Sequence, residues 1–176
     1  AGHASADPDG RNGQARRHGR RQLGGHQFEH DGEGAGRLAL ESFTLEEFIA
    51  REIDAGRFKA QFKALPQKKA LLHGHCHQKA FGTLKALRKV LGALAGVQVD
   101  WIESSCCGMA GSFGYEARHY EVSMRMAEAS LLPKIREAGK NTLIVADGTS
   151  CRHQIHDGAK RNAVHVARVL ESALAD

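Results

Sequence analysis

The pattern of hydrophobic and polar residues changes near residue 37. Residues 1–36 hold nine of the twenty glycines, and their large aliphatic and aromatic side chains are limited to Leu23 and Phe28. Such a segment buries too little apolar surface to offset its loss of chain entropy. We therefore expect residues 1–36 to be disordered or foreign to the fold, and residues 37–176 to form the folded domain.

Beyond residue 37, helical and extended patterns alternate. Apolar residues at helical spacing predict helices after the Thr44–Glu47 capping box and over residues 78–94, 115–137 (kinked or divided by Pro133) and 163–174. Short apolar runs predict buried strands over residues 69–73, 97–102 and 142–146. Because strands and helices alternate, we expect an α/β fold in which flanking helices cover a parallel sheet through right-handed crossovers.

The charge of the chain does not indicate a nucleic-acid partner. The formal net charge is +5 and the isoelectric point is about 9.2. Five arginines lie in the unusual N-terminal stretch, and the remainder is nearly balanced. Because no aromatic residues interleave with a basic patch, we expect no nucleic acid as partner.

The chain also shows no sign of direct membrane insertion. No stretch of the sequence approaches the roughly 18 consecutive apolar residues of a membrane span. The N-terminal residues contain no apolar core of a signal peptide, which favours a cytoplasmic, reducing location. In such a compartment the four cysteines are more typical of metal ligands, catalytic groups or buried side chains than of disulfides.

Every cysteine follows a predicted strand. Cys76 comes after the first strand, the Cys106–Cys107 pair after the second, and Cys151 after the third. In a parallel sheet the strand-to-helix loops share the carboxyl edge, where the loops of neighbouring strands converge. The pattern therefore predicts that three separate segments bring four thiols together at one edge of the sheet.

The adjacent cysteines lie in a glycine-rich stretch, CCGMAGSFG. Neighbouring residues of a regular strand point to opposite faces, so both thiols reach one centre only from an irregular loop. Gly108 and Gly111 permit such a loop and a close approach of the backbone to a bulky group. Their exposed backbone N–H groups are expected to bind the sulfides of an iron–sulfur cluster.

Other readings of these residues stay open. A single cysteine in an apolar fold is usually a small buried side chain. The histidines near the cysteines are compatible either with zinc binding or with ordinary loop positions; they are His73, His75, His77 and His153. Met109 and Phe113 are candidates for an apolar wall beside the thiols or for the core. No Walker loop or dinucleotide fingerprint is present, so no flavin or nicotinamide site is expected within this chain.

Three segments, HCHQKAFG, ESSCCGMAGSFGYE and DGTSCRHQI, resemble the cysteine-rich CCG domain of iron–sulfur oxidoreductases. That family includes the iron–sulfur subunits of glycolate and glycerol-3-phosphate dehydrogenases, heterodisulfide reductase, and large FAD-linked oxidases fused to an iron–sulfur module. The resemblance covers residues 38–176. It implies a cluster, expected to be 4Fe-4S, with Cys76, Cys106, Cys107 and Cys151 as metal ligands and Gly108 and Gly111 as cofactor-binding residues.

The chain departs from the family pattern in its last motif. The family has a CxxC pair there, and the position of its first cysteine is Gly148 in this chain. Four thiols still suffice for a conventional cluster. The resemblance further implies a C-terminal fragment whose partners are an FAD-binding dehydrogenase domain or subunit, a second CCG domain and a ferredoxin-like domain.

The expected function is electron transfer in a flavin-linked 2-hydroxy acid dehydrogenase or oxidase. The alternatives are a catalytic cluster like that of heterodisulfide reductase, a structural zinc-binding module, and a remnant without function.

Overall fold

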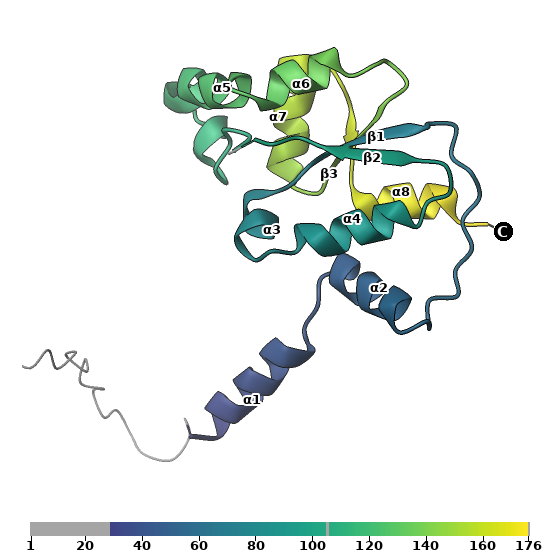
Figure 1. The fold of residues 1–176 in the computed structure, drawn as a ribbon. Coiled ribbons are helices and arrows are strands. Elements are labelled where there is room, and N and C mark those ends of the chain that lie inside the picture. Colours follow the sequence, from purple (N-terminus) through teal and green to yellow (C-terminus); the bar gives the residue numbers. More distant parts are fainter. Residues whose placement is uncertain (1–28, 105, 176) are drawn as a thin grey trace, which may run out of the picture. The chain divides into compact units, whose positions relative to one another are not determined.

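The computed structural model describes residues 29–104 and 106–175 (Figure 1). The described chain divides into two units, with the boundary between Ser42 and Phe43. The first unit contains helix α1 (Glu29–Glu41), and the Ser42 hydroxyl donates to the Leu38 carbonyl at its end. Residues 29–36 were expected to lack regular structure but are helical, because the helix-forming residues that follow them continue one helix. Residues 1–28 lie outside the described part.

The second unit is an α/β fold built on four parallel strands. They are β1 (Lys69–His73), β2 (Gln98–Trp101), β3 (Leu143–Ala146) and β4 (Ala163–Val164), in the order β2-β1-β3-β4. Leu72 on β1 pairs with Trp101 on one side and Val145 on the other. This arrangement confirms the predicted fold class and the three predicted strands; β4, two residues long, was not predicted.

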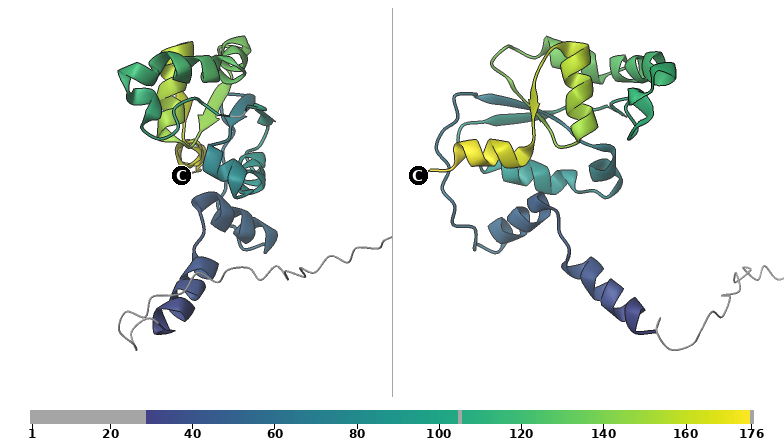
Figure 2. Two further views of the ribbon diagram at one scale, coloured as in Figure 1. Left: turned by 90° about the vertical axis from the view of Figure 1, so that its left-hand side faces the viewer. Right: turned by 180° about the vertical axis from the view of Figure 1, so that it is seen from behind.

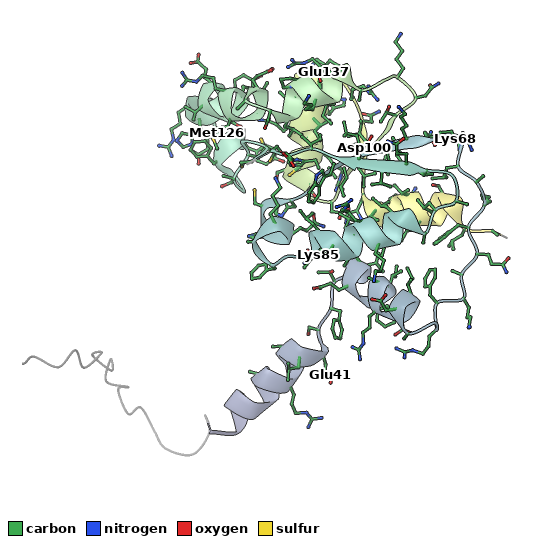
Figure 3. The ribbon with its side chains drawn as sticks, viewed as in Figure 1. Glu41, Lys68, Lys85, Asp100, Met126 and Glu137 are labelled. Atoms are coloured by element: carbon green, nitrogen blue, oxygen red, sulfur yellow. The ribbon has the colours of Figure 1, made fainter. Side chains whose placement is uncertain are left out.

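Helices cover both faces of the sheet (Figures 1 and 2). On one face lie α4 (Leu84–Gly92) and α8 (Val166–Ala173), with α2 (Leu45–Asp54) packed on α4. On the other lie α6 (Leu131–Glu137) and α7 (Thr149–Ala159), with α5 (Tyr120–Glu128) beside them. Lys85 on α4 and Glu137 on α6 mark these two layers in Figure 3, and Asp100 marks the outer strand β2.

Successive residues of the strands belong alternately to two hydrophobic clusters on opposite faces of the sheet. Leu72 and Val145 pack against α4 and α8, whereas Leu71 and Ile144 pack toward α6 and α7. Because successive side chains of a strand point to opposite faces, each strand serves both layers. The second cluster also contains Cys107 and Cys151, so two of the four cysteines belong to the hydrophobic core. This core fixes the base of the loops that carry the thiols.

Two predicted helices are divided in the structure. The helix expected over residues 78–94 becomes α3 (Cys76–Ala80) and α4, because the chain turns at Gly82 with φ +74°. The helix expected over residues 115–137 becomes two 3₁₀ turns (Phe113–Tyr115 and Ala117–His119) followed by α5 and α6. Pro133 lies in the first turn of α6, where a proline removes no intrahelical hydrogen bond.

Besides α1, helix α7 was not predicted, and the closing helix was predicted to begin too early. Helix α7 has weak apolar periodicity because the side chains that it buries are Cys151, Gln154 and Ile155, of which only the last is strongly apolar. The closing helix begins at Val166 and not at residue 163, because residues 163–164 pair with β3. His165 caps it by accepting the Ala167 N–H. Among the described residues, no helix has the length and apolar character that crossing a membrane requires.

Candidate metal centre

Cys76 is held at the carboxyl end of the central strand β1. It is the first residue of α3, and His75 caps this short helix. The His75 N–H donates to Gln78 Oε1 at 2.9 Å, and His75 Nδ1 accepts the His77 N–H at 3.3 Å. Because both ends of this capping box are bonded, the position of Cys76 relative to β1 is well defined.

Cys106 and Cys107 lie in the loop after β2, and Gly108 shapes this loop. Gly108 has φ +88°, and a Cβ atom there would lie 2.1 Å from the carbonyl oxygen of Ser123 on α5. The Gly108 N–H donates to Cys106 Sγ at 3.2 Å. Glycine is therefore required both by the backbone conformation and by the close contact with α5. The predicted irregular loop is confirmed.

Cys151 lies in the first turn of α7, directly after β3. It is fully buried, and Arg152 beside it donates to the carbonyl oxygens of Ala146 and Asp147 at 3.1 and 2.6 Å. Gly148 is the N-cap of this helix. A Cβ atom at Gly148 would lie 2.4 Å from His75 Cδ2 and 2.9 Å from Cys151 Sγ. The position at which the resemblance implies a further cysteine therefore borders the same site.

The four thiols meet as two close pairs. Cys76 Sγ lies 3.8 Å from Cys106 Sγ, and Cys107 Sγ lies 3.3 Å from Cys151 Sγ. The strand order explains the meeting, because β2, β1 and β3 are consecutive neighbours whose carboxyl ends share one edge. The predicted convergence of three segments is confirmed in the structure, and no disulfide links these four cysteines.

His73 is a member of the site that the sequence did not distinguish from the histidines near it. It is the last residue of β1, is fully buried, and shares a hydrogen bond of 3.0 Å between its Nδ1 and Ser104 Oγ. Its Nε2 has no hydrogen-bond partner among the described residues. Three potential ligand atoms, a ring nitrogen of His73 and the sulfurs of Cys107 and Cys151, all lie within 4.8 Å of one another. The signal was the position of His73 within the strand pattern KALLH, which places it inside the sheet.

The other histidines have different places. His75 and His77 line a cavity of about 210 Å³ beside the thiols. The full lining consists of His75, Cys76, His77, Cys107, Ala110, Gly111 and Ser150. His153 points elsewhere, because its Nδ1 bonds the Tyr115 hydroxyl at 2.7 Å on the surface. Gly111, predicted to bind the cofactor, thus borders the cavity.

Met109 lies in the hydrophobic core next to two of the thiols. Its side chain is buried in the same cluster as Cys107 and Cys151, and the Ser123 hydroxyl donates to its sulfur at 3.7 Å. Phe113 instead stacks on the ring of His119, with 4.0 Å between ring centroids. Of the two alternatives considered for Met109, the structure favours the core, and neither Met109 nor Phe113 lines the cavity.

The buried thiols of Cys107 and Cys151 differ in their pKa values. The Cys151 thiol donates to Cys107, and this bond lowers the pKa of Cys107 to about 4, with further contributions from the His73 ring and the Met109 N–H. The same bond, together with burial, raises the pKa of Cys151. Within the pair, the shared hydrogen bond therefore favours Cys151 as the donor and Cys107 as the acceptor.

Burial acts on the groups around the pair as well. It raises the pKa of Cys76, with a second contribution from the bond to Cys106. It also lowers the pKa of His75, so the neutral imidazole is favoured. The lowered pKa of His75 thus favours the state in which histidine binds metals, whereas a metal would have to displace the proton of the Cys76 thiol.

The donor set fits a thiolate-bound metal group. Four thiols from three segments lie in two close pairs. Next to them, His73 Nε2 is buried without a hydrogen-bond partner among the described residues. The Gly108 N–H also donates to the sulfur of Cys106. Sulfur-rich sites of this kind select zinc or iron–sulfur clusters over hard cations, because thiolates are soft ligands.

Comparison with known proteins gives relatives among dehydrogenases. The chain is 30% identical over 128 residues to a subunit of the anaerobic glycerol-3-phosphate dehydrogenase of Escherichia coli K12, covering 73% of this chain and 31% of that protein. It is 31% identical over 101 residues to D-2-hydroxyglutarate dehydrogenase of Pseudomonas putida, covering 56% of this chain and 10% of that protein. The enzyme of the same name from E. coli K12 is 32% identical over 83 residues, which cover 47% of this chain and 8% of that enzyme.

These similarities are to parts of larger proteins. The chain spans about a third of the length of the glycerol-3-phosphate dehydrogenase subunit and a tenth or less of the D-2-hydroxyglutarate dehydrogenases. No family model matches the chain, and no solved structure matches it. Since the relatives are named as dehydrogenases, the chain is related to components of oxidoreductases.

Proposed function

We propose that this chain is an iron–sulfur electron-transfer domain of a flavin-linked 2-hydroxy acid dehydrogenase or oxidase. The observation that carries the proposal is the meeting of Cys76, the Cys106–Cys107 pair and Cys151 at the carboxyl edge of three neighbouring strands. Four thiolates are the usual ligand set of a [4Fe–4S] cluster. The similarity to dehydrogenase components supports an oxidoreductase setting for this cluster.

In this proposal the four cysteines are the ligands, and position 148 decides the kind of cluster. A fifth thiol there is excluded in this chain because the residue is glycine. The contacts of a Cβ atom at Gly148 with His75 and Cys151 show how little space surrounds that position. The four remaining thiols favour a conventional four-ligand cluster.

The bound cluster would supply a site that accepts and releases one electron at a time. The residues of this chain would set its potential. The Gly108 N–H donates to the sulfur of Cys106, and such bonds stabilise negative charge on a ligand sulfur. Met109 and the buried Cys107 and Cys151 place one side of the site in the hydrophobic core, which limits access of water.

The substrate oxidation is assigned to a partner. The relatives from P. putida and E. coli are named for D-2-hydroxyglutarate, a 2-hydroxy acid, and the glycerol-3-phosphate dehydrogenase relative is named as one subunit of its enzyme. We infer an FAD-binding dehydrogenase domain or subunit that delivers electrons to this domain. A second CCG domain and a ferredoxin-like domain would carry electrons onward to a quinone or a soluble acceptor.

Metal and acid-labile sulfide analysis of anaerobically purified protein tests the proposal. We expect iron and sulfide in near-equal amounts, with a broad visible absorption that dithionite bleaches. Reconstitution of the reduced protein with ferrous iron and sulfide should reach the same content. Protein that binds neither iron nor sulfide in either experiment would rule the proposal out.

A structural zinc site is the second candidate, favoured by one distance. Zinc–sulfur bonds of about 2.3 Å in a tetrahedron place two sulfurs about 3.8 Å apart. The Cys76–Cys106 separation of 3.8 Å has this value. The same analysis separates the two candidates, since a zinc site contains zinc without sulfide and does not respond to dithionite.

A further inference from the structure

The two close thiol pairs have a property beyond metal binding. The Sγ atoms of Cys107 and Cys151 lie 3.3 Å apart, and those of Cys76 and Cys106 lie 3.8 Å apart. A disulfide bond has a sulfur–sulfur distance of about 2.05 Å. Each pair therefore needs to close by less than about 2 Å, a distance within the range of side-chain rotation.

We propose that, without its metal group, the site is a pair of redox switches in which hydrogen peroxide converts Cys107–Cys151 and Cys76–Cys106 into disulfides. The oxidised state would withdraw all four thiols from metal binding, and dithiol reduction would restore them. The regulatory consequence, loss of metal binding on oxidation, rests on the proposed function, because both concern the same site. The disulfides themselves form or fail to form independently of that function.

The chemistry is balanced with peroxide as the oxidant. The sulfur of Cys107 attacks one peroxide oxygen, the O–O bond breaks, and a sulfenic acid and water result. The Cys151 thiol then attacks the sulfenic sulfur, the S–S bond forms, and the S–O bond breaks with loss of water. The pair loses two electrons and the peroxide gains them. Cys76 and Cys106 consume a second peroxide in the same way.

The cavity and the pairing of the sulfurs together determine which thiols an oxidant can reach. Cys76, which is half-buried, and Cys107, which is buried, both border the cavity of about 210 Å³, so a small oxidant reaches Cys107 by entering that cavity. Cys151 is fully buried and bonds Cys107, so it is placed as the resolving thiol. A thiol held next to the cysteine that is oxidised is the arrangement in which a sulfenic acid condenses to a disulfide.

The pairing also argues against a disulfide bond between the adjacent residues Cys106 and Cys107. Cys106 Sγ accepts the Gly108 N–H and faces Cys76, whereas Cys107 Sγ faces Cys151. The two neighbouring sulfurs thus face different partners: the partner of Cys106 follows β1, and the partner of Cys107 follows β3. A vicinal disulfide would require the glycine loop to rearrange.

Tryptic mapping of the metal-free full chain distinguishes the pairings. Cys76 falls in peptide 70–79, Cys106 and Cys107 share peptide 90–118, and Cys151 falls in peptide 141–152. After treatment with hydrogen peroxide, acid quenching and non-reducing digestion, we expect peptide 90–118 linked to both others. Fragment ions should join Cys106 to peptide 70–79 and Cys107 to peptide 141–152.

Two matched variants test the assignment independently. Cys106→Ser should lose the link to peptide 70–79 and keep the link to peptide 141–152, and Cys107→Ser should show the reverse. A direct link between peptides 70–79 and 141–152 in the wild-type protein, a Cys106–Cys107 bond, or sulfinic acids in place of crosslinks would overturn the inference. The wild-type fragment ions decide the question if a variant fails to fold.

Iron loading then separates this inference from the proposed function. Oxidised protein should lose its capacity to take up iron and sulfide, and dithiothreitol should restore it. If crosslinks form as described but reduced protein takes up no iron, the switch stands and the proposed function fails. If reduced protein takes up iron but peroxide produces no crosslinks, the proposed function stands and the switch fails.

Discussion

Cys151 Sγ lies 3.3 Å from Cys107 Sγ although 44 positions separate the two residues in the chain. They follow strands β2 and β3, which are not neighbours, because β1 lies between them. The loop after β2 and the first turn of helix α7 therefore meet at the end of β1. His73, the last residue of β1, is buried there, and one of its ring nitrogens lies within 4.8 Å of both sulfurs.

Replacing either adjacent cysteine should remove the metal group. We expect Cys106→Ser or Cys107→Ser to lower the iron content of anaerobically purified protein at least about tenfold, because each removes a thiolate ligand. His77→Ala is the matched control, since His77 lines the cavity without belonging to either thiol pair, and its protein should keep most of its iron. Full iron content in both cysteine variants would refute the ligand assignment.

Replacing Gly108 with alanine should destabilise the protein more than the same replacement at Gly111. Gly108→Ala combines a positive φ with a Cβ atom 2.1 Å from the Ser123 oxygen, and we expect a loss of about 3 kcal/mol in the free energy of unfolding. Gly111→Ala has φ +67° but open space around the Cβ atom, so about 1 kcal/mol should be lost. Urea denaturation of both variants measures the difference, and equal losses would contradict the close contact with α5.

Asp147 should stabilise the base of the site. One of its carboxylate oxygens accepts the Val166 N–H at 2.8 Å and the other accepts from Gln78 at 2.6 Å, so it joins α8 and α3 to the end of β3. Asp147→Ala leaves both donors without this partner and should cost about 2 kcal/mol. Asp157→Ala, at an exposed position on α7, should change stability by less than about 0.5 kcal/mol. Similar denaturation midpoints for the two variants would show that these bonds contribute little.

Removing the metal group should weaken the fold without abolishing it. All four strands and their flanking helices contribute residues to the two hydrophobic clusters, either as buried members or as partly buried residues packed against them. The domain therefore has a core that does not depend on the metal. We expect metal-free protein to keep its far-UV circular dichroism and to melt cooperatively, with a melting temperature lowered by at least about 5 °C. A chain that loses its helical signal on metal removal would instead be folded by its metal, as small zinc modules are.

Much of the fold and the location of the site follow from local patterns. The run KALLH predicts β1 with the boundaries observed, and the Thr44–Glu47 capping box predicts the start of α2, where both of its hydrogen bonds form. Strand alternation with helices predicts a parallel sheet, and parallel strands necessarily place their following loops at one edge. The sequence alone therefore brings Cys76, the Cys106–Cys107 pair and Cys151 to the same edge.

The pairing of the thiols and the burial of His73 were decided by tertiary structure. Strand order is a property of the whole sheet, and in the order β2-β1-β3 the segments that carry Cys107 and Cys151 lie on either side of β1 and meet at its end. Helix α7 escaped prediction because its buried side chains include a cysteine and a glutamine, whose burial depends on the site itself. Local periodicity reports what one element buries, whereas the contacts between loops depend on how separate elements pack together.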